Sequence, residues 1–379
     1  MLVKRAINIE SQIQPGKTLL IFGPRRVGKT TLLQEFQKTS PKKIITYNGD
    51  NLSAQNNFSI PDISNLAPLV AGFDILIVDE AQNIPNFGQS LKILNDQMPD
   101  LTVIATGSSS FQLHGQVGEP LVGRKNTIYL YPLSLNEIIL HQGEKPPLLL
   151  WQETKEQLLI YGTYPNSVLA ASNHERQKFL LEMVDSLLLK DILKFQEVKG
   201  SAVVLKLLRL LAFQIGNEVS LEELGKNIGI SRNTVARYLD LLEKAYVIFR
   251  LGGFSRNLRS EITKMSKYYF YDIGIRNALI NNFNILDMRD DTGKLWENFA
   301  LMERVKHQSY HSLFVNNFFW RTWSQNEIDL IEEQNGKLHA FEFKYSSVKH
   351  VSPPKEFIKN YKNSSFQVVS PDNILKFLG

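Results

Sequence analysis

Short apolar runs alternate with amphipathic stretches along the first 140 residues. Five of these runs are typical of strands: Thr18–Phe22, Lys43–Tyr47, Ile75–Val78, Thr102–Ala105 and Asn126–Leu130. Strands that alternate with helices indicate a parallel α/β sheet. The third run is apolar throughout, as expected for a strand that is covered on both faces. We therefore predict an α/β fold with a parallel P-loop NTPase-type sheet for residues 1–145.

The pattern of polar and apolar positions changes twice further along the chain. Gly143, Pro146 and Pro147 break the first pattern, and helical periodicity dominates from there to about residue 280. After the polar stretch Asn281–Lys294, an amphipathic helix precedes three strand-like runs, which are Phe314–Trp323, Glu327–Glu332 and Lys337–Tyr345. Tight polar turns between these runs favour an antiparallel meander. The expected division is 1–145, a helical linker at 146–199, a helical part at 200–285, and an α/β module at 290–379.

Composition narrows the class of protein. The chain has 379 residues, of which 43% are hydrophobic and 21% charged, and it has no cysteine. Disulfides and cysteine-bound zinc are therefore excluded, and a reducing compartment is favoured. The first ten residues do not resemble a signal peptide, and no window approaches 18 apolar residues. We expect a cytoplasmic protein without a membrane partner.

The positive charge is concentrated in one segment. The net charge is +5, and residues 201–280 hold 12 Lys and Arg against 7 Asp and Glu, a difference of +5 that equals the whole surplus. A local surplus of this kind indicates an anionic partner, although many solvated protein surfaces carry a similar charge.

A phosphate-binding motif follows the first predicted strand. It comprises Gly23, Pro24, Arg25, Arg26, Val27, Gly28, Lys29 and Thr30, and Thr31 continues into a predicted helix. This sequence fits the pattern G-x-x-x-x-G-K-[ST], in which glycines allow backbone N–H groups to surround phosphate oxygens. Lys29 is expected to reach the β- and γ-phosphates, and the Thr30 hydroxyl to bind Mg²⁺. The motif predicts that the chain binds ATP with Mg²⁺.

Two acids end the apolar run Ile75–Val78. The carboxyl end of a central parallel strand lies beside the phosphate-binding loop, so Asp79 is expected to hold the Mg²⁺ and Glu80 to act as the general base for the attacking water. The alternative, in which the acids only meet solvent, does not explain why they follow a phosphate-binding motif. The arrangement predicts ATP hydrolysis.

Two further residues are candidates for the hydrolytic site. Ser108 follows the next predicted strand and is favoured over Thr106 as a sensor of the γ-phosphate or the water. Arg124 is a candidate arginine finger that stabilises charge on the transferred phosphoryl group. The alternatives are a serine-rich turn and an ordinary surface arginine.

The basic segment contains a candidate helix-turn-helix. Ser220–Ile228 and Ser231–Leu242 are predicted to form two helices joined by a turn at Gly229. The second helix presents polar residues opposite an apolar stripe, as recognition helices of DNA-binding proteins do. A hairpin with a basic loop is expected to follow, which suits a winged helix; the loop residues are Arg256, Arg259, Lys264 and Lys267. DNA is the expected partner, and packing or protein binding is the alternative.

An acidic cluster is expected in the last part of the chain. Glu342 and Lys344 are two apart on a predicted strand and so share a face, and Asp329 on the preceding strand can approach them. Glu297 lies on the preceding helix. Glu297, Asp329 and Glu342 are candidate Mg²⁺ ligands, and Lys344 is a candidate for orienting a water toward a phosphodiester. A salt-bridged cluster on a sheet face is the alternative.

These motifs together resemble a family of bacterial and archaeal AAA-type P-loop ATPases that carry a C-terminal domain of unknown function 4143. The resemblance lies in the phosphate-binding motif, Val-Asp-Glu-Ala-Gln at 78–82, Thr-Gly-Ser-Ser-Ser at 106–110, and Tyr-Pro-Leu-Ser-Leu at 131–135. It implies a P-loop fold with an additional strand and a catalytic glutamate. The C-terminal cluster resembles the PD-(D/E)xK nuclease fold, although Glu327 and Ile328 precede Asp329 without the nominal proline.

Two functions are compatible with these patterns. The first is a Mg²⁺-dependent ATPase that acts with DNA through a winged helix and a nuclease-like C-terminal domain. The second is an ATP-gated signalling or scaffolding switch that binds protein partners and cleaves no nucleic acid. An oligomer is compatible with both.

Overall fold

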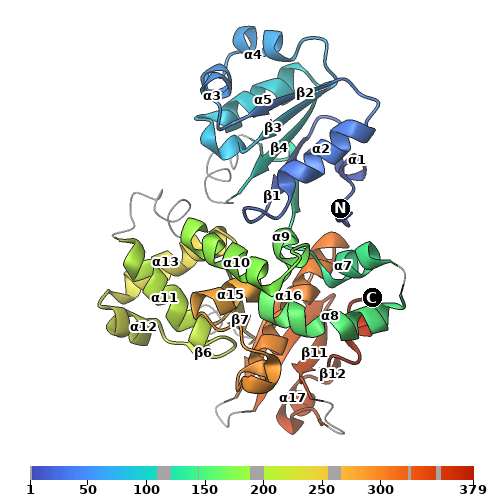
Figure 1. Cartoon of the computed structure of the whole chain (residues 1–379). Coiled ribbons are helices and arrows are strands. Elements are labelled where there is room, and N and C mark those ends of the chain that lie inside the picture. The colour runs from blue at the N-terminus through green and yellow to red at the C-terminus, as the bar shows by residue number, and fades with distance from the viewer. Residues whose placement is uncertain are drawn as a thin grey trace. The chain divides into compact units, whose positions relative to one another are not determined.

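The computed structural model describes residues 2–108, 121–143, 145–187, 200–254, 266–322, 326–346 and 351–379. They form two compact units. The N-terminal unit comprises Leu2–Pro132 with Lys244–Tyr246, and the C-terminal unit comprises Leu133–Glu243 with Val247–Gly379. Figure 1 draws the N-terminal unit mainly in blue and cyan and the C-terminal unit in green to red.

A five-stranded parallel sheet forms the centre of the N-terminal unit, in the order β2-β3-β4-β1-β5. The strands are β1 (Thr18–Phe22), β2 (Ile44–Asn48), β3 (Ile75–Asp79), β4 (Thr102–Gly107) and β5 (Lys125–Tyr129). The predicted α/β fold is thereby confirmed. Every residue of β1 and β3 is buried, whereas the edge strands are half-buried, which explains why the apolar runs of the inner strands are the more continuous.

The helices of this unit lie before β1 and between successive strands. They are α1 (Ile9–Gln12), α2 (Lys29–Thr39), α3 (Leu52–Phe58), α4 (Ile63–Val70), η1 (Ala81–Asn83) and α5 (Phe87–Gln97). The sheet is parallel, so the ends of β1, β3 and β4 lie on one edge. The phosphate-binding loop follows β1 there and leads into α2, next to the ends of β3 and β4.

The C-terminal unit begins with helices, as the periodicity predicts. They are α7 (Leu135–Gln142), α8 (Pro147–Tyr161), α9 (Pro165–Val168), α10 (Asn173–Leu187), α11 (Ser201–Phe213), α12 (Leu221–Ile228) and α13 (Arg232–Lys244). The later helices are α15 (Ile273–Leu279), η3 (Leu286–Met288), α16 (Thr292–Tyr310), α17 (Lys355–Asn360) and α18 (Ile374–Phe377). Among the described residues, no helix is long and apolar enough to span a bilayer.

One seven-stranded sheet runs through the C-terminal unit, in the order β12-β11-β10-β9-β7-β8-β6. Its strands are β6 (Glu218–Val219), β7 (Ile248–Gly253), β8 (Ser266–Phe270), β9 (Asn316–Arg321), β10 (Glu327–Gln334), β11 (Lys337–Phe343) and β12 (Ser364–Val369). The predicted meander β9-β10-β11 is antiparallel, and β12 adds a parallel strand that the apolar pattern did not indicate.

The sheet crosses a boundary that the sequence suggested. Strand β7 pairs in parallel with β9 through Gly252 and Phe318. The predicted parts at 200–285 and 290–379 therefore share a sheet. The four-part division of the chain stays a prediction, and the pairing of β7 with β9 joins its last two parts.

Candidate functional site

The phosphate-binding loop lies between β1 and α2. Gly23 packs against the Leu130 carbonyl so closely that a Cβ at this position would overlap it, and Gly28 has φ 97° at the start of α2. Arg26 also adopts a left-handed backbone, with φ 59°. Alternating backbone conformations of this kind turn successive N–H groups toward one point, which makes a concave anion site. The glycines are thus explained by close packing and by backbone conformation.

Lys29 is almost fully buried, with 4% of its surface exposed. Its Nζ donates to the Gly23 and Pro24 carbonyls, at 2.9 Å each. The ammonium group is therefore held within the curve of the loop, where it can transfer its hydrogen bonds to phosphate oxygens.

Thr30 and Asp79 meet across the site. The Thr30 hydroxyl donates to Asp79 Oδ2 at 2.6 Å, although 49 residues separate them in sequence. A hydroxyl and a carboxylate at one point are oxygen ligands that suit Mg²⁺. The donor set fits the metal, and these two residues are the ones that would hold it.

Thr106 organises both acids from β4. Its hydroxyl, which is fully buried, donates to Asp79 Oδ1 and accepts from the Glu80 N–H at 3.0 Å. Glu80 has φ 51°, a conformation that few residues other than glycine adopt. Strained backbone persists where surrounding contacts fix it, as at many functional sites. The sequence analysis favoured Ser108 over Thr106, and it is Thr106 that contacts Asp79 and Glu80 directly.

Ser108 and Gln82 lie beside Glu80. Gln82 Nε2 donates to Glu80 Oε2 and to Ser108 Oγ, the latter at 3.3 Å. Ser108 and the candidate general base Glu80 thus share a donor, and the sensor role of Ser108 stays a prediction. The sequence gives no prediction for these contacts of Gln82, which lies within the Val-Asp-Glu-Ala-Gln motif at 78–82.

Arg5 supports the loop from a distant part of the sequence. Its guanidinium donates to the Val27 and Tyr131 carbonyls, at 2.7 Å each. The sequence carried no signal for this contact, because nothing local marks a partner 126 residues away.

Arg124 lies at the other edge of the sheet. Its carbonyl accepts from the Thr18 N–H, at the beginning of β1, whereas the phosphate-binding loop follows the end of β1. Five residues of strand separate these edges by roughly 16 Å. Arg124 also pairs with Asp96 at 2.7 Å. It cannot act as a finger on the nucleotide of its own chain, so that role stays a prediction only for a neighbouring copy.

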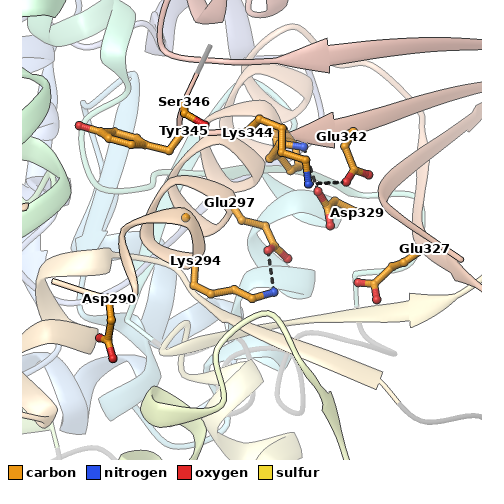
Figure 2. A pocket seen from close by; sticks show the side chains of 11 residues that line it. Asp290, Lys294, Glu297, Glu327, Asp329, Glu342, Lys344, Tyr345 and Ser346 are labelled. Atoms are coloured by element: carbon orange, nitrogen blue, oxygen red, sulfur yellow. Dashed lines mark hydrogen bonds and ion pairs between the residues drawn. The ribbon is translucent and has the colours of Figure 1, made fainter. Parts of the chain in front are cut away.

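A second candidate site is a cavity of about 620 Å³ in the C-terminal unit. Figure 2 shows Glu297 of α16, Asp329 of β10 and Glu342 of β11 gathered on one side of the cavity, while Asp290 lies apart from them. Glu297, Asp329, Glu342 and Lys344 all line the cavity, so the structure brings the predicted cluster together. The β10–β9 register shifts between Ile328 and Ile331, the stretch of β10 that contains Asp329.

Asp329 is deeply buried in this cavity. Burial, followed by the nearby Glu297 and Glu342 carboxylates, raises its pKa to about 8, although Lys267 and the Phe343 N–H oppose the shift. The Phe343 N–H donates to Asp329 Oδ2 at 2.9 Å. Lys344 pairs with Glu342 at 2.8 Å.

Glu297 already accepts hydrogen bonds from two neighbouring side chains. Tyr269 Oη donates to Glu297 Oε1 at 2.7 Å, and Lys294 Nζ donates to Oε2 at 3.0 Å (the latter drawn in Figure 2). Within the described ranges, no three acidic or histidine side chains are arranged as a metal site. The assignment of Glu297, Asp329 and Glu342 as Mg²⁺ ligands stays a prediction, and in this arrangement Glu297 accepts hydrogen bonds from Tyr269 and Lys294.

The position of Lys267 differs from the prediction, which placed it in a basic loop. It lies on β8 with 1% of its side chain exposed, bonds to Glu327, and lies 3.7 Å from Glu297 Oε1. Burial alone would lower its pKa, but Glu297, Asp329 and Glu327 outweigh burial and raise it. Lys267 is thus a buried cation beside Glu297 and Glu327. The other loop residues, Arg256, Arg259 and Lys264, lie outside the described residues.

The candidate helix-turn-helix forms as two helices. Helices α12 and α13 are joined closely, since a Cβ on Gly225 would overlap the Ile230 carbonyl. Val235, Leu239 and Leu242 are buried on α13, as predicted, while Arg232 and Arg237 are exposed. Arg232 pairs with Glu222 of α12 at 2.9 Å.

Three segments of the chain match known protein families. Residues 15–139 match the AAA domain family. Residues 152–285 match a domain of unknown function numbered 8612, and residues 292–376 match one numbered 4143. The AAA-type domain and the C-terminal domain 4143 that the motifs indicated are thereby confirmed as resemblances, and the AAA match supports ATP binding. The winged helix and the nuclease-like module stay predictions.

Similar proteins are known from bacteria and archaea. An uncharacterized protein of Mycobacterium tuberculosis is 27% identical over 361 residues, which cover 93% of this chain and 76% of that protein. An uncharacterized protein of Methanocaldococcus jannaschii is 24% identical over 342 residues, covering 86% and 74%. A solved structure of the ORC2 protein of Aeropyrum pernix in its ADP form covers 72% of this chain and 90% of that chain, at 12% identity. Its TM-score is 0.33, which is too low to support an argument.

Proposed function

We propose that the chain binds ATP with Mg²⁺ at the phosphate-binding loop and hydrolyses it. The observation that carries this proposal is the continuous network from Thr30 through Asp79 and Thr106 to the Glu80 backbone. It joins the ends of β3 and β4 to the start of α2, which is the place where a bound γ-phosphate lies in proteins with this loop.

Each residue has a separate task in this proposal. Backbone N–H groups of the loop and Lys29 bind the phosphates and neutralise charge that develops on them. Thr30 and Asp79 hold the Mg²⁺, whose contribution is to polarise the phosphate oxygens. The Glu80 carboxylate accepts a proton from the attacking water, and the Ser108 hydroxyl contacts the γ-phosphate or the water as a sensor. These tasks require a buried, fixed site rather than a flexible one.

The test measures ATP binding and turnover in the same preparation. We expect Lys29→Ala to lose tight binding of ATP, because the site loses the buried ammonium group that would bind the phosphates. Lys92→Ala, at an exposed lysine of the same unit, serves as the control. Wild-type affinity in Lys29→Ala would refute the assignment of the loop.

DNA is the partner that we propose for helices α12 and α13, acting as a winged helix-turn-helix. Support comes from the buried stripe on α13 and from its exposed Arg232 and Arg237. A protein that neutralises several phosphates loses affinity steeply as salt rises. We expect DNA binding that weakens with salt and falls further in the double variant Arg232→Ala, Arg237→Ala. No binding in the wild type would favour the alternative, an ATP-gated switch for protein partners.

Cleavage of DNA at the acidic cavity stays a prediction of the sequence. The convergence of Asp329, Glu342 and Lys344 supports it, and the engagement of Glu297 by Tyr269 and Lys294 opposes it. The test follows DNA on a gel with Mg²⁺ or Mn²⁺. Cleavage by the wild type that is lost in Glu342→Gln and in Lys344→Ala would support a nuclease. DNA that stays intact with the wild type would mean that the cavity is a structural ion-pair cluster.

A further inference from the structure

Gln82 occupies a position beside the candidate general base. It lies in η1, two residues after Glu80, and 6% of its surface is exposed. Its Nε2 donates both to Glu80 Oε2 and to Ser108 Oγ. One amide group therefore links the acid at the end of β3 to the hydroxyl that follows β4.

The two hydrogen bonds fix the orientation of the amide. If the group were reversed, its carbonyl oxygen would lie against the Glu80 carboxylate, and two acceptors repel each other at that distance. Nε2 is therefore the amide atom that faces Glu80, and Oε1 is the other polar atom of the same amide.

The amide oxygen of Gln82 is buried and accepts no hydrogen bond from any described residue. Buried polar atoms without a partner are rare in proteins, and they often mark a place where a water or a ligand completes the site. Here the oxygen belongs to a group in direct contact with the residue that would activate the attacking water. A water is the smallest donor that can satisfy this oxygen.

We propose that Gln82 positions the attacking water of ATP hydrolysis, an inference that rests on the proposed function. Gln82 Nε2 fixes one oxygen of the Glu80 carboxylate, which leaves the other oxygen to accept a proton from the water. Gln82 Oε1 accepts the second hydrogen of the same water. With both hydrogens held, a lone pair of the water oxygen points toward the γ-phosphorus.

The reaction balances without change to Gln82. The water oxygen forms a bond to the γ-phosphorus, and one of its protons passes to the Glu80 carboxylate. The bond between the γ-phosphorus and the bridging oxygen breaks, and ADP leaves with the electron pair. The amide orients the water and takes no proton.

The test compares three variants in the full-length protein. Gln82→Ala removes the amide, and Gln82→Glu keeps its shape while replacing the donor nitrogen with oxygen. Asn83→Ala, at the next residue of η1, is the control, because its amide contacts Asp50 and not Glu80. For each variant, the melting temperature, the dissociation constant for ATP with Mg²⁺, KM and kcat are measured.

We expect both Gln82 variants to bind ATP within about twofold of the wild type and to lose kcat by about 100-fold, with KM little changed. Asn83→Ala should keep the wild-type kcat. Wild-type kcat in Gln82→Ala would overturn the proposal, as would a loss of kcat that is matched by a loss of ATP binding. If the wild type itself turns over no ATP, the proposed function fails first, and Gln82 loses its role with it.

Discussion

Thr106→Val tests how the β4 hydroxyl controls the catalytic acids. The change keeps the shape of a fully buried side chain and removes the hydroxyl that donates to Asp79 and accepts from the Glu80 N–H. A hydrogen bond to a charged group contributes about 1.5–3 kcal/mol, and one between neutral groups about 1 kcal/mol. The Glu80 N–H keeps a longer contact with Asp79 Oδ1, at 3.2 Å, so part of the loss is recovered.

We therefore expect the free energy of unfolding of the N-terminal unit to fall by about 2 kcal/mol in this variant. The same contacts hold Glu80 in its left-handed conformation, so the base should lose its position. If the displaced base lowers the stabilisation of the transition state by about 1.4 to 2.7 kcal/mol, kcat falls about 10- to 100-fold. The affinity for ATP should change little, because Lys29 and the loop are untouched.

A matched control lies on the adjacent strand. Thr18 is also fully buried, and its hydroxyl contacts the Asn95 amide at the beginning of β1, the end away from the phosphate-binding loop. Thr18→Val makes the same chemical change, so it should lower stability to a similar extent and leave kcat unchanged. Steady-state ATP turnover and thermal unfolding of both variants decide the matter. Wild-type turnover in Thr106→Val, or an equal loss in Thr18→Val, would refute the reasoning.

Three further changes probe the packing of both units. Lys267→Met should lower the free energy of unfolding of the C-terminal unit by about 3–5 kcal/mol, because it leaves buried carboxylates without their cation. Denaturant unfolding measures this loss, and Lys337→Met, at an exposed position, should have little effect. The raised pKa of Asp329 means that unfolding of the wild type releases a proton between about pH 4 and about pH 8, so the wild type loses stability as pH rises through this range. Asp329→Asn lacks this proton and should therefore gain stability relative to the wild type. A difference in the free energy of unfolding that stays constant with pH would contradict this. Gly23→Ala should weaken ATP binding, measured by titration, because its Cβ overlaps the Leu130 carbonyl; unchanged affinity would count against the close packing.

The sequence predicted the N-terminal site because its signals are local. Glycines of the loop, the apolar strand before it and the acids after β3 each lie within a few residues of the element that positions them. The parallel sheet then brings Thr30 and Asp79 together, although they are 49 residues apart. Thr106 and Gln82 were harder to assign, since their roles depend on which hydroxyl and which amide face Glu80 after packing.

The C-terminal unit shows where local patterns fail. Lys267 was assigned to a basic loop because basic residues cluster there, yet it pairs with Glu327, 60 residues later, and is buried on β8. Nothing local marks the pairing of β7 with β9, and β12 was not predicted as a strand. These features follow from tertiary packing, which the periodicity of apolar residues and the strand propensity of single residues do not predict.

A single-turnover experiment on Glu80→Gln tests the central claim most directly. The substitution keeps the size of the side chain and removes the carboxylate that would accept the proton, while Lys29, Thr30 and Asp79 remain. With enzyme in excess over labelled ATP and Mg²⁺, we expect the wild type to convert bound ATP to ADP and phosphate, and the variant to bind ATP equally well and retain it uncleaved. Cleavage at the wild-type rate in Glu80→Gln would contradict the account of this site as one in which Glu80 activates water.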